Sequence, residues 1–320
     1  MPSRDIVERL AGGEILIHDG ATGSELQRRG VDVNRGATSE ELGVWSATAN
    51  LEAPEVVQAV HEDYLRAGAD IITSNNFYTT REMLKLIEDE DRWEEYTRRG
   101  GEIAVRARDA VNPEAYVAGG FAPPYQGDLR REFGDQARVL AETGVDFLLA
   151  EYMAGDTVLE DPIRDCITAI EVCAATGLPA FVGISNLTDD GTLFGGGTLE
   201  ELAIALKGQP VAALLLMCSF PAQISAGLPR LRGAFDGPIG CYAHLGYERN
   251  PRFGESPAEP YYLIDRLGYT PERYAECALE WKQIGAQVIG GCCATGPDHI
   301  KALRSAIRDE HQESNPETSG

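Results

Sequence analysis

The chain has 320 residues, 43% of them hydrophobic, which is enough for two ordinary domains or for one large α/β barrel. Its net charge of −23 argues against binding to nucleic acids or anionic membranes through a basic surface. No apolar run of roughly 18 residues and no secretory signal pattern is present, so we expect no membrane span. Seven cysteines without a compact disulfide framework fit a reducing, cytoplasmic location.

Eight short apolar runs follow one another along the chain, most of them followed by a segment with helical periodicity. The runs predicted to be buried strands are 15–18, 69–74, 115–118, 145–150, 180–184, 212–217, 238–242 and 286–289. Successive runs lie far enough apart for a crossover helix to join each pair. This alternation predicts a parallel sheet covered by helices, and eight units favour a single (β/α)8 TIM barrel over a doubly wound open sheet.

The sequence predicts several of the connecting helices. They are predicted over 54–65, 198–206, 271–284 and 297–307. Pro54 suits the first turn of its helix, and Thr198 suits a capping position before an acidic first turn. Because no linker or strong internal repeat interrupts the pattern, we predict one domain over residues 1–308. The polar segment 309–320 is expected to be a disordered tail.

Three cysteines stand at the ends of predicted strands, where a barrel of this kind places its chemistry. Cys218 directly follows one strand, and Cys292 and Cys293 follow the last strand after two glycines. Adjacent cysteines can hardly bridge each other, because an ordinary disulfide needs both Cβ atoms turned inward. Three thiolates on one Zn²⁺ would leave its fourth tetrahedral position open, as in catalytic sites. The alternative is that these thiols only pack in the core.

Polar and aromatic residues end other predicted strands. The candidates at these ends are Asp19, Asn76, Tyr78, Glu151 and His244. A carboxylate that closes an apolar strand would be costly to bury unless it is paired, which singles out Glu151 for substrate binding. Asp19 is a second candidate for substrate binding. The alternative is that its side chain only caps the following turn. Asn76 and His244 are further candidates for substrate contact, and His244 also fits an ordinary loop.

The segments 19–26, 67–72 and 290–293, with Glu151 at a strand end, resemble the homocysteine S-methyltransferases. The resemblance covers roughly residues 12–308, and the Gly-Gly-Cys-Cys element with an upstream strand-end cysteine is its most specific part. It implies a zinc-dependent (β/α)8 barrel that moves a methyl group onto the thiol of homocysteine and so forms methionine.

The same resemblance implies roles for individual residues. Cys218, Cys292 and Cys293 would hold Zn²⁺, and the homocysteine sulfur would become the fourth ligand as a nucleophilic thiolate. Asp19 and Glu151 would hold the amino acid through its ammonium group. The substrates would then be homocysteine and a small methyl donor.

The pair Glu151-Tyr152 looks most similar to the betaine–homocysteine methyltransferase branch. In that branch the tyrosine can occupy the fourth zinc position until homocysteine displaces it, which implies this role for Tyr152. Trp45 and Tyr78 match positions where the branch places aromatic rings beside the donor. Aromatic faces attract onium groups, and the donors in view are betaine, dimethylsulfoniopropionate, S-methylmethionine and S-adenosylmethionine.

Three places depart from the family pattern. Met217 stands where asparagine is usual, Ala243-His244 replaces proline and asparagine, and Asn75-Asn76 replaces a pair with threonine. The zinc cysteines are intact, but the acceptor and donor are left open. The alternatives are another thiol acceptor, a corrinoid protein as donor, or a non-catalytic zinc- or thiol-binding protein. The sequence also leaves open whether the chain forms a homo-oligomer.

Overall fold

The computed structural model describes residues 2–38, 41–154, 161–185, 187–193, 196–249, 261–263 and 268–313. Eight parallel strands form one sheet in the order β1-β10-β7-β6-β5-β4-β3-β2. These strands are β1 Leu16–Ile17, β2 Ile71–Thr73, β3 Tyr116–Phe121, β4 Phe147–Met153, β5 Ala180–Ile184, β6 Val211–Met217, β7 Ile239–Ala243 and β10 Ala286–Gly291. A parallel bridge between His18 and Ile71 brings the two edge strands together. The predicted TIM barrel is confirmed.

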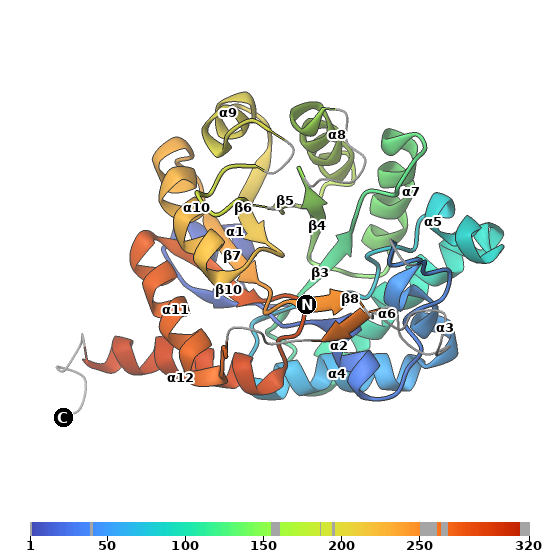
Figure 1. Cartoon of the computed structure of the whole chain (residues 1–320), viewed down its shortest axis with the longest axis horizontal. Coiled ribbons are helices and arrows are strands. Elements are labelled where there is room, and N and C mark those ends of the chain that lie inside the picture. Colours follow the sequence, from blue (N-terminus) through green and yellow to red (C-terminus); the bar gives the residue numbers. More distant parts are fainter. Residues whose placement is uncertain are drawn as a thin grey trace.

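Helices surround this sheet on its outer side (Figure 1). The longer ones are α2 Thr22–Arg28, α4 Pro54–Ala67, α6 Trp93–Val111, α7 Leu129–Glu142, α8 Pro162–Ala174, α9 Leu199–Ala205, α10 Pro221–Ala234, α11 Pro271–Ile284 and α12 Pro297–Glu313. Short helical segments lie between them: η1 Trp45–Thr48, α3 Ala49–Glu52, α5 Arg81–Leu84, η2 Lys85–Ile87 and η3 Glu90–Arg92. The helix starts follow the local sequence, since Thr198 and Glu201 form a reciprocal capping box at α9.

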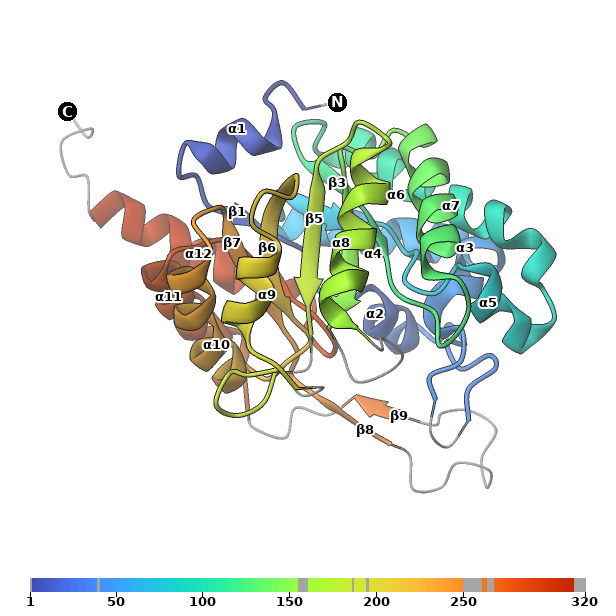
Figure 2. The ribbon, with the colours of Figure 1, turned by 90° about the horizontal axis from the view of Figure 1, so that it is seen from above.

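Two further elements mark the two ends of the barrel. Helix α1, Ile6–Ala11, lies at one end, and the antiparallel hairpin of β8 (Tyr247–Arg249) and β9 (Tyr261–Leu263) lies at the other (Figure 2). The hairpin is on the side toward which the β5 arrow points, which is the carboxyl end of the strands. No helix within the described ranges combines the length and apolar composition that a bilayer span requires.

The barrel strands alternate between two apolar layers. On β4, Phe147 and Leu149 belong to the interior cluster, whereas Leu148 and Ala150 pack in the cluster between sheet and helices. Because successive side chains of a strand point to opposite faces, Glu151 continues the inward series at the carboxyl end. The fold therefore places the carboxyl group of Glu151 at the open, carboxyl-terminal end of the barrel.

Helix α12 continues through Glu313, beyond the predicted domain boundary at 308. Residues 309–313 contain no glycine or proline and include straight-chain residues, which are compatible with a helix. The rest of the predicted tail, 314–320, lies outside the described residues.

Asp70 joins the two edge strands of the sheet to α12. Its Oδ2 accepts hydrogen bonds from the Ile17 backbone N–H at 2.9 Å and from Arg304 Nη1 at 2.5 Å. Replacing Asp70 with alanine should lower the free energy of unfolding by about 1–3 kcal/mol, because a partly buried N–H and a guanidinium lose their acceptor. Urea denaturation would show a lower midpoint at unchanged slope.

Asp63 on α4 provides the matched control, because it is more exposed and pairs with Arg29 and Arg66 at the surface. Such pairs contribute at most about 1 kcal/mol. Equal losses in Asp70→Ala and Asp63→Ala would contradict the role of Asp70 in closing the barrel.

Candidate active site

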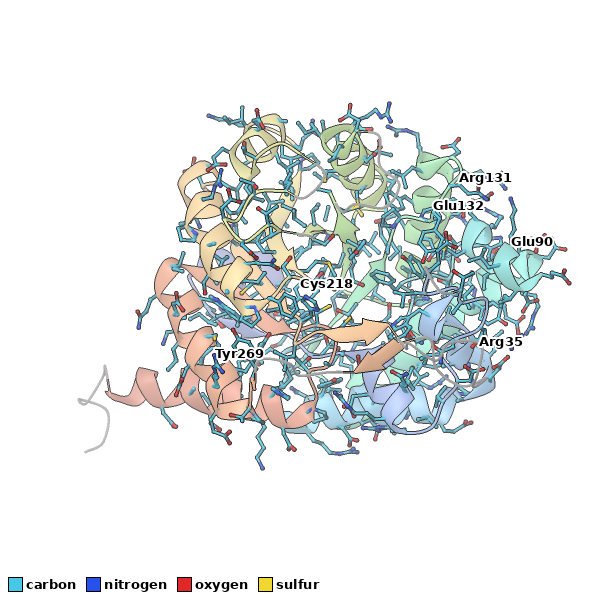
Figure 3. All side chains as sticks on the ribbon, in the orientation of Figure 1. Arg35, Glu90, Arg131, Glu132, Cys218 and Tyr269 are labelled. Carbon is cyan, nitrogen blue, oxygen red and sulfur yellow. The ribbon has the colours of Figure 1, made fainter. Side chains whose placement is uncertain are left out.

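A cavity of about 480 Å³ opens where the barrel strands end. Its walls include residues at or just beyond the ends of β1, β2, β4, β6, β7 and β10, although these positions are far apart in the sequence. Figure 3 labels Cys218 near the middle of the ring of helices, whereas Arg35, Glu90 and Arg131 lie toward its outside. A cavity of this size suits a small molecule or two small molecules bound together.

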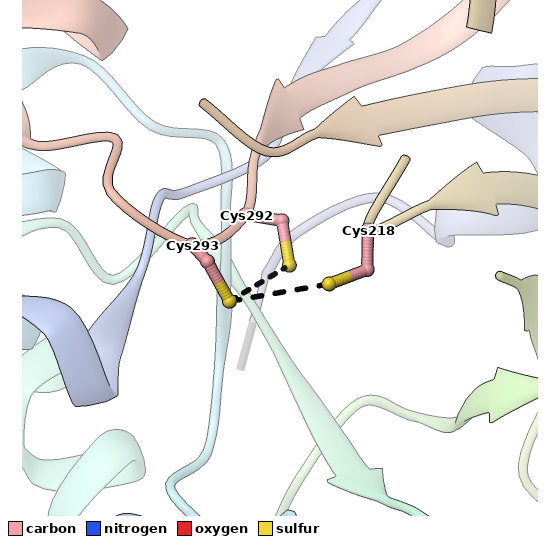
Figure 4. A group of neighbouring side chains, drawn as sticks. All are labelled: Cys218, Cys292 and Cys293. Carbon is pink, nitrogen blue, oxygen red and sulfur yellow. Dashed lines mark hydrogen bonds between the residues drawn. The ribbon is translucent and has the colours of Figure 1, made fainter. Parts of the chain in front are cut away.

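Three cysteine sulfurs meet in this cavity. The Sγ atoms of Cys218, Cys292 and Cys293 all lie within 4.8 Å of one another, and Cys293 Sγ is 3.9 Å from each of the other two (Figure 4). A tetrahedral zinc ion with Zn–S bonds of about 2.3 Å separates its sulfur ligands by roughly 3.8 Å. The donor set and its spacing therefore fit one zinc ion held from one side.

The local backbone explains how the cysteines reach this position. A Cβ atom on Gly290 would lie 2.7 Å from the His18 carbonyl oxygen, and one on Gly291 would lie 2.3 Å from Thr295 Oγ1. Gly290 therefore allows β10 to come this close to the end of β1, and Gly291 leaves room for the Thr295 side chain. Cys218 follows β6 in a left-handed conformation with φ of 46°, a strained geometry that fixes the direction of its side chain.

The three thiols are electrostatically linked. Hydrogen bonds from Cys218 and Cys292 hold the pKa of the Cys293 thiol well below its usual range. Hydrogen bonds with Cys218 first, and then with Cys293, raise the pKa of the Cys292 thiol. Without a cation the cluster thus favours one thiolate shared with two thiol donors. A divalent cation reverses this balance, since it stabilises every thiolate that binds it.

Two carboxyl groups are buried beside the sulfurs. Asp19 Oδ2 accepts the Thr73 backbone N–H at 2.9 Å, and its Oδ1 is 3.4 Å from His18 Nδ1. Glu151 Oε1 accepts the Tyr242 hydroxyl at 3.3 Å. Burial raises the pKa of Glu151 to about 8 and raises that of Asp19 well above its usual range. Among the described residues, no lysine or arginine lines the cavity, so a cationic group of a ligand would satisfy both carboxyls.

An aromatic wall completes the cavity. Phe77 lies 4.6 Å from Tyr78 and 6.0 Å from Tyr152 between ring centroids, and Tyr125 lies 5.5 Å from Tyr78. Trp45 also lines the cavity and is largely buried. The faces of these rings attract a cation through their π electrons, which suits an onium group.

Eight of the ten predicted site residues line this cavity: Asp19, Trp45, Tyr78, Glu151, Tyr152, Cys218, Cys292 and Cys293. Asn76 and His244 are not among the lining residues. Asn76 points toward α6, where its Nδ2 donates to the Thr97 carbonyl at 2.9 Å. The His244 ring packs against Phe220 with ring centroids 4.3 Å apart. Burial lowers the pKa of His244, and the charge of nearby Cys293 opposes this shift.

Sequence reasoning gave no role to some residues that shape the site. Met217 Sδ accepts a hydrogen bond from the Tyr152 backbone N–H at 3.0 Å and lies 3.0 Å from the Tyr242 hydroxyl oxygen. The single proton of this hydroxyl is therefore shared between Met217 and Glu151. Asn75 lines the cavity in place of Asn76 and accepts the Ser46 hydroxyl at 2.6 Å. Strand alternation could have identified Met217, because it follows the inward-facing Leu215 by two residues on β6 and therefore also points inward.

Comparison with known proteins adds independent findings. A family model described as homocysteine S-methyltransferase matches residues 16–307. Betaine–homocysteine S-methyltransferase 1 of Bos taurus is 26% identical, over 96% of this chain and 75% of that protein. S-methylmethionine–homocysteine S-methyltransferase of Rattus norvegicus is 27% identical, over 95% and 82%. The metallated homocysteine methyltransferase MmuM from Escherichia coli has a TM-score of 0.70 at 26% identity, over 91% of this chain and 96% of that one.

Proposed function

The chain belongs to the homocysteine S-methyltransferase family, and on this premise we propose that it transfers a methyl group from an onium donor to homocysteine, giving methionine. The observation that carries the proposal is one cavity that combines three thiols, two buried carboxyls and an aromatic wall. Each part matches one requirement of the reaction: activation of a thiol, binding of an ammonium group and binding of an onium group.

Cys218, Cys292 and Cys293 would hold Zn²⁺, because their sulfurs have the chemistry and spacing that this ion requires. When bound, zinc supplies a Lewis acid that keeps an additional thiol deprotonated near neutral pH. Tyr152 lines the same cavity, and its backbone, with φ of 58°, is held by its N–H donating to Met217 Sδ. We assign Tyr152 the role of closing the site until the thiol substrate enters.

The amino-acid part of homocysteine would bind through its ammonium group to Asp19 and Glu151. Thr73 fixes one oxygen of Asp19, while Tyr242 donates to Glu151. Burial lowers the pKa of His18 to about 4, so its imidazole is neutral and does not compete with the ammonium for Asp19. Binding thus places the substrate thiol at the side of the cavity where the cysteines lie.

The methyl donor would occupy the aromatic side of the cavity, against Trp45, Phe77, Tyr78 and Tyr125. The step is an in-line displacement. A sulfur lone pair of homocysteine forms the new S–C bond, while the electron pair of the breaking bond stays on the donor nitrogen or sulfur. The rate would come from holding donor and acceptor close and aligned.

Turnover with defined donors tests this function. Reduced, zinc-loaded protein should convert homocysteine to methionine with at least one of betaine, S-methylmethionine, dimethylsulfoniopropionate and S-adenosylmethionine. Mass spectrometry would detect methionine together with the matching demethylated donor, and reactions without homocysteine serve as blanks. Absence of methionine with all four donors, while zinc is bound, would contradict the proposal and redirect the search to another thiol acceptor.

A further inference from the structure

The turn after β10 has an unusual backbone. Ala294, directly after Cys293, has φ of 68°, a left-handed conformation that residues with a Cβ seldom adopt. This conformation is unfavourable for a residue with a Cβ and persists only where the surroundings hold it. Within the turn, the Thr295 hydroxyl donates to the Cys292 carbonyl at 2.6 Å. The Thr295 backbone N–H donates to the same carbonyl at 3.1 Å, and the Leu245 backbone N–H donates to the Cys293 carbonyl at 2.9 Å. Ala294 itself is held by helix α2.

Arg28, the last residue of α2, binds the outer side of this turn. Its Nη2 donates to the Ala294 carbonyl at 2.6 Å and its Nη1 to the Thr295 carbonyl at 3.2 Å. Nη1 also donates to Glu25 Oε1 at 2.5 Å, one helical turn earlier on α2. A planar guanidinium can reach these acceptors together, whereas a lysine ammonium lacks the rigid fork.

The inner side of the turn is bound by the same helix. Ser24 Oγ accepts the Ala294 backbone N–H at 3.1 Å. Helix α2 therefore holds Ala294 by its N–H and by its carbonyl oxygen, and the preceding residue is Cys293. The Cys293 sulfur is the one at 3.9 Å from both other sulfurs, so its position decides whether the three can bind one ion (Figure 4).

We propose that Arg28 is a positioning residue for the metal site, which sets metal affinity by holding the turn that carries Cys292 and Cys293. The proposal rests on the zinc assignment of the proposed function. Arg28 does not line the cavity and is partly exposed, so it acts through the turn and not on substrate. Ser24 lines the cavity and is therefore less suited to a test.

Zinc affinity, measured by competition with a chromophoric chelator, tests this role in Arg28→Gln and Arg28→Lys. Both variants should bind zinc about 10- to 100-fold more weakly than the unaltered protein, the usual effect of losing a group that orients a metal ligand. They should also release zinc faster to excess chelator. Arg29→Gln is the matched control, because Arg29 also pairs with Glu25 but otherwise binds Asp63 on α4. Its zinc affinity should stay within about twofold of the unaltered protein.

Unfolding of the metal-free proteins separates positioning from general destabilisation. If Arg28→Gln proves too unstable to assay, Arg28→Lys decides, because lysine keeps the positive charge beside Glu25. Unaltered zinc affinity in Arg28→Lys, or in a folded Arg28→Gln, would overturn the proposal while leaving the zinc site intact. Absence of zinc binding by the unaltered protein would instead refute the zinc assignment, and with it the premise of the proposal.

Discussion

Replacing Cys293 with alanine is expected to abolish both zinc binding and methyl transfer. Cys293 Sγ lies 3.9 Å from each of the other two sulfurs. Its loss removes one of the three ligands and leaves only Cys218 and Cys292 to bind the ion. Losing a residue that only orients a ligand already costs about 10- to 100-fold in metal affinity. Losing a ligand itself should therefore exceed about 100-fold, and turnover should fall with it. Metal analysis and the methionine assay on one preparation measure both.

Cys277→Ala is the control for this experiment. Cys277 lies on α11, is partly buried and does not belong to the sulfur cluster. Its replacement should leave zinc content and turnover near the level of the unaltered protein. A Cys293→Ala protein that lacks zinc yet forms methionine at the full rate would refute the proposed mechanism, whatever the control shows.

The barrel could be predicted from the sequence because its strands are covered on both faces. Strands of this kind appear as continuous apolar runs, and each of the eight runs coincides with a strand of the barrel. The hairpin of β8 and β9 was not predicted. Each of its strands has only three residues, too few for any periodicity to emerge from the sequence.

The site was predictable where a side chain stands at the end of a strand or directly after it. Glu151 and the three cysteines stand at strand ends, and parallel strands bring those ends together. Beyond a strand end the alternation stops, and turn dihedrals decide which side chain faces the cavity. Asn75 and Asn76 illustrate this, since the first lines the cavity and the second binds the Thr97 carbonyl behind it. The sequence offers no signal that separates two adjacent asparagines.

Replacing Glu151 with glutamine should raise the KM for homocysteine strongly. The substrate ammonium would favour the ionised form of this carboxyl. The amide has the same shape but no charge, so the ammonium loses one of its two buried partners. Removing one member of a buried charge pair costs about 2–5 kcal/mol, which corresponds to roughly 30- to several thousand-fold. Glu132→Gln is the matched control, because Glu132 is also buried, with a pKa raised by burial, but lies on α7 outside the cavity lining. An unchanged KM in Glu151→Gln would exclude this carboxyl from substrate binding.

The same substitution should make the metal-free protein more stable, with a definite pH dependence. Burial raises the pKa of Glu151 from an ordinary value of 4.5 to about 8, so between these values the folded state keeps a proton that the unfolded state releases. The free energy of unfolding therefore falls as pH rises through this window. Glutamine removes the effect, so the advantage of Glu151→Gln should be small near pH 4.5 and grow until about pH 8. Urea midpoints at several pH values measure it, and parallel pH profiles for the two proteins would contradict it. A carboxyl that lowers stability because burial opposes its ionisation, and whose removal impairs substrate binding, is maintained for the ligand and not for the fold.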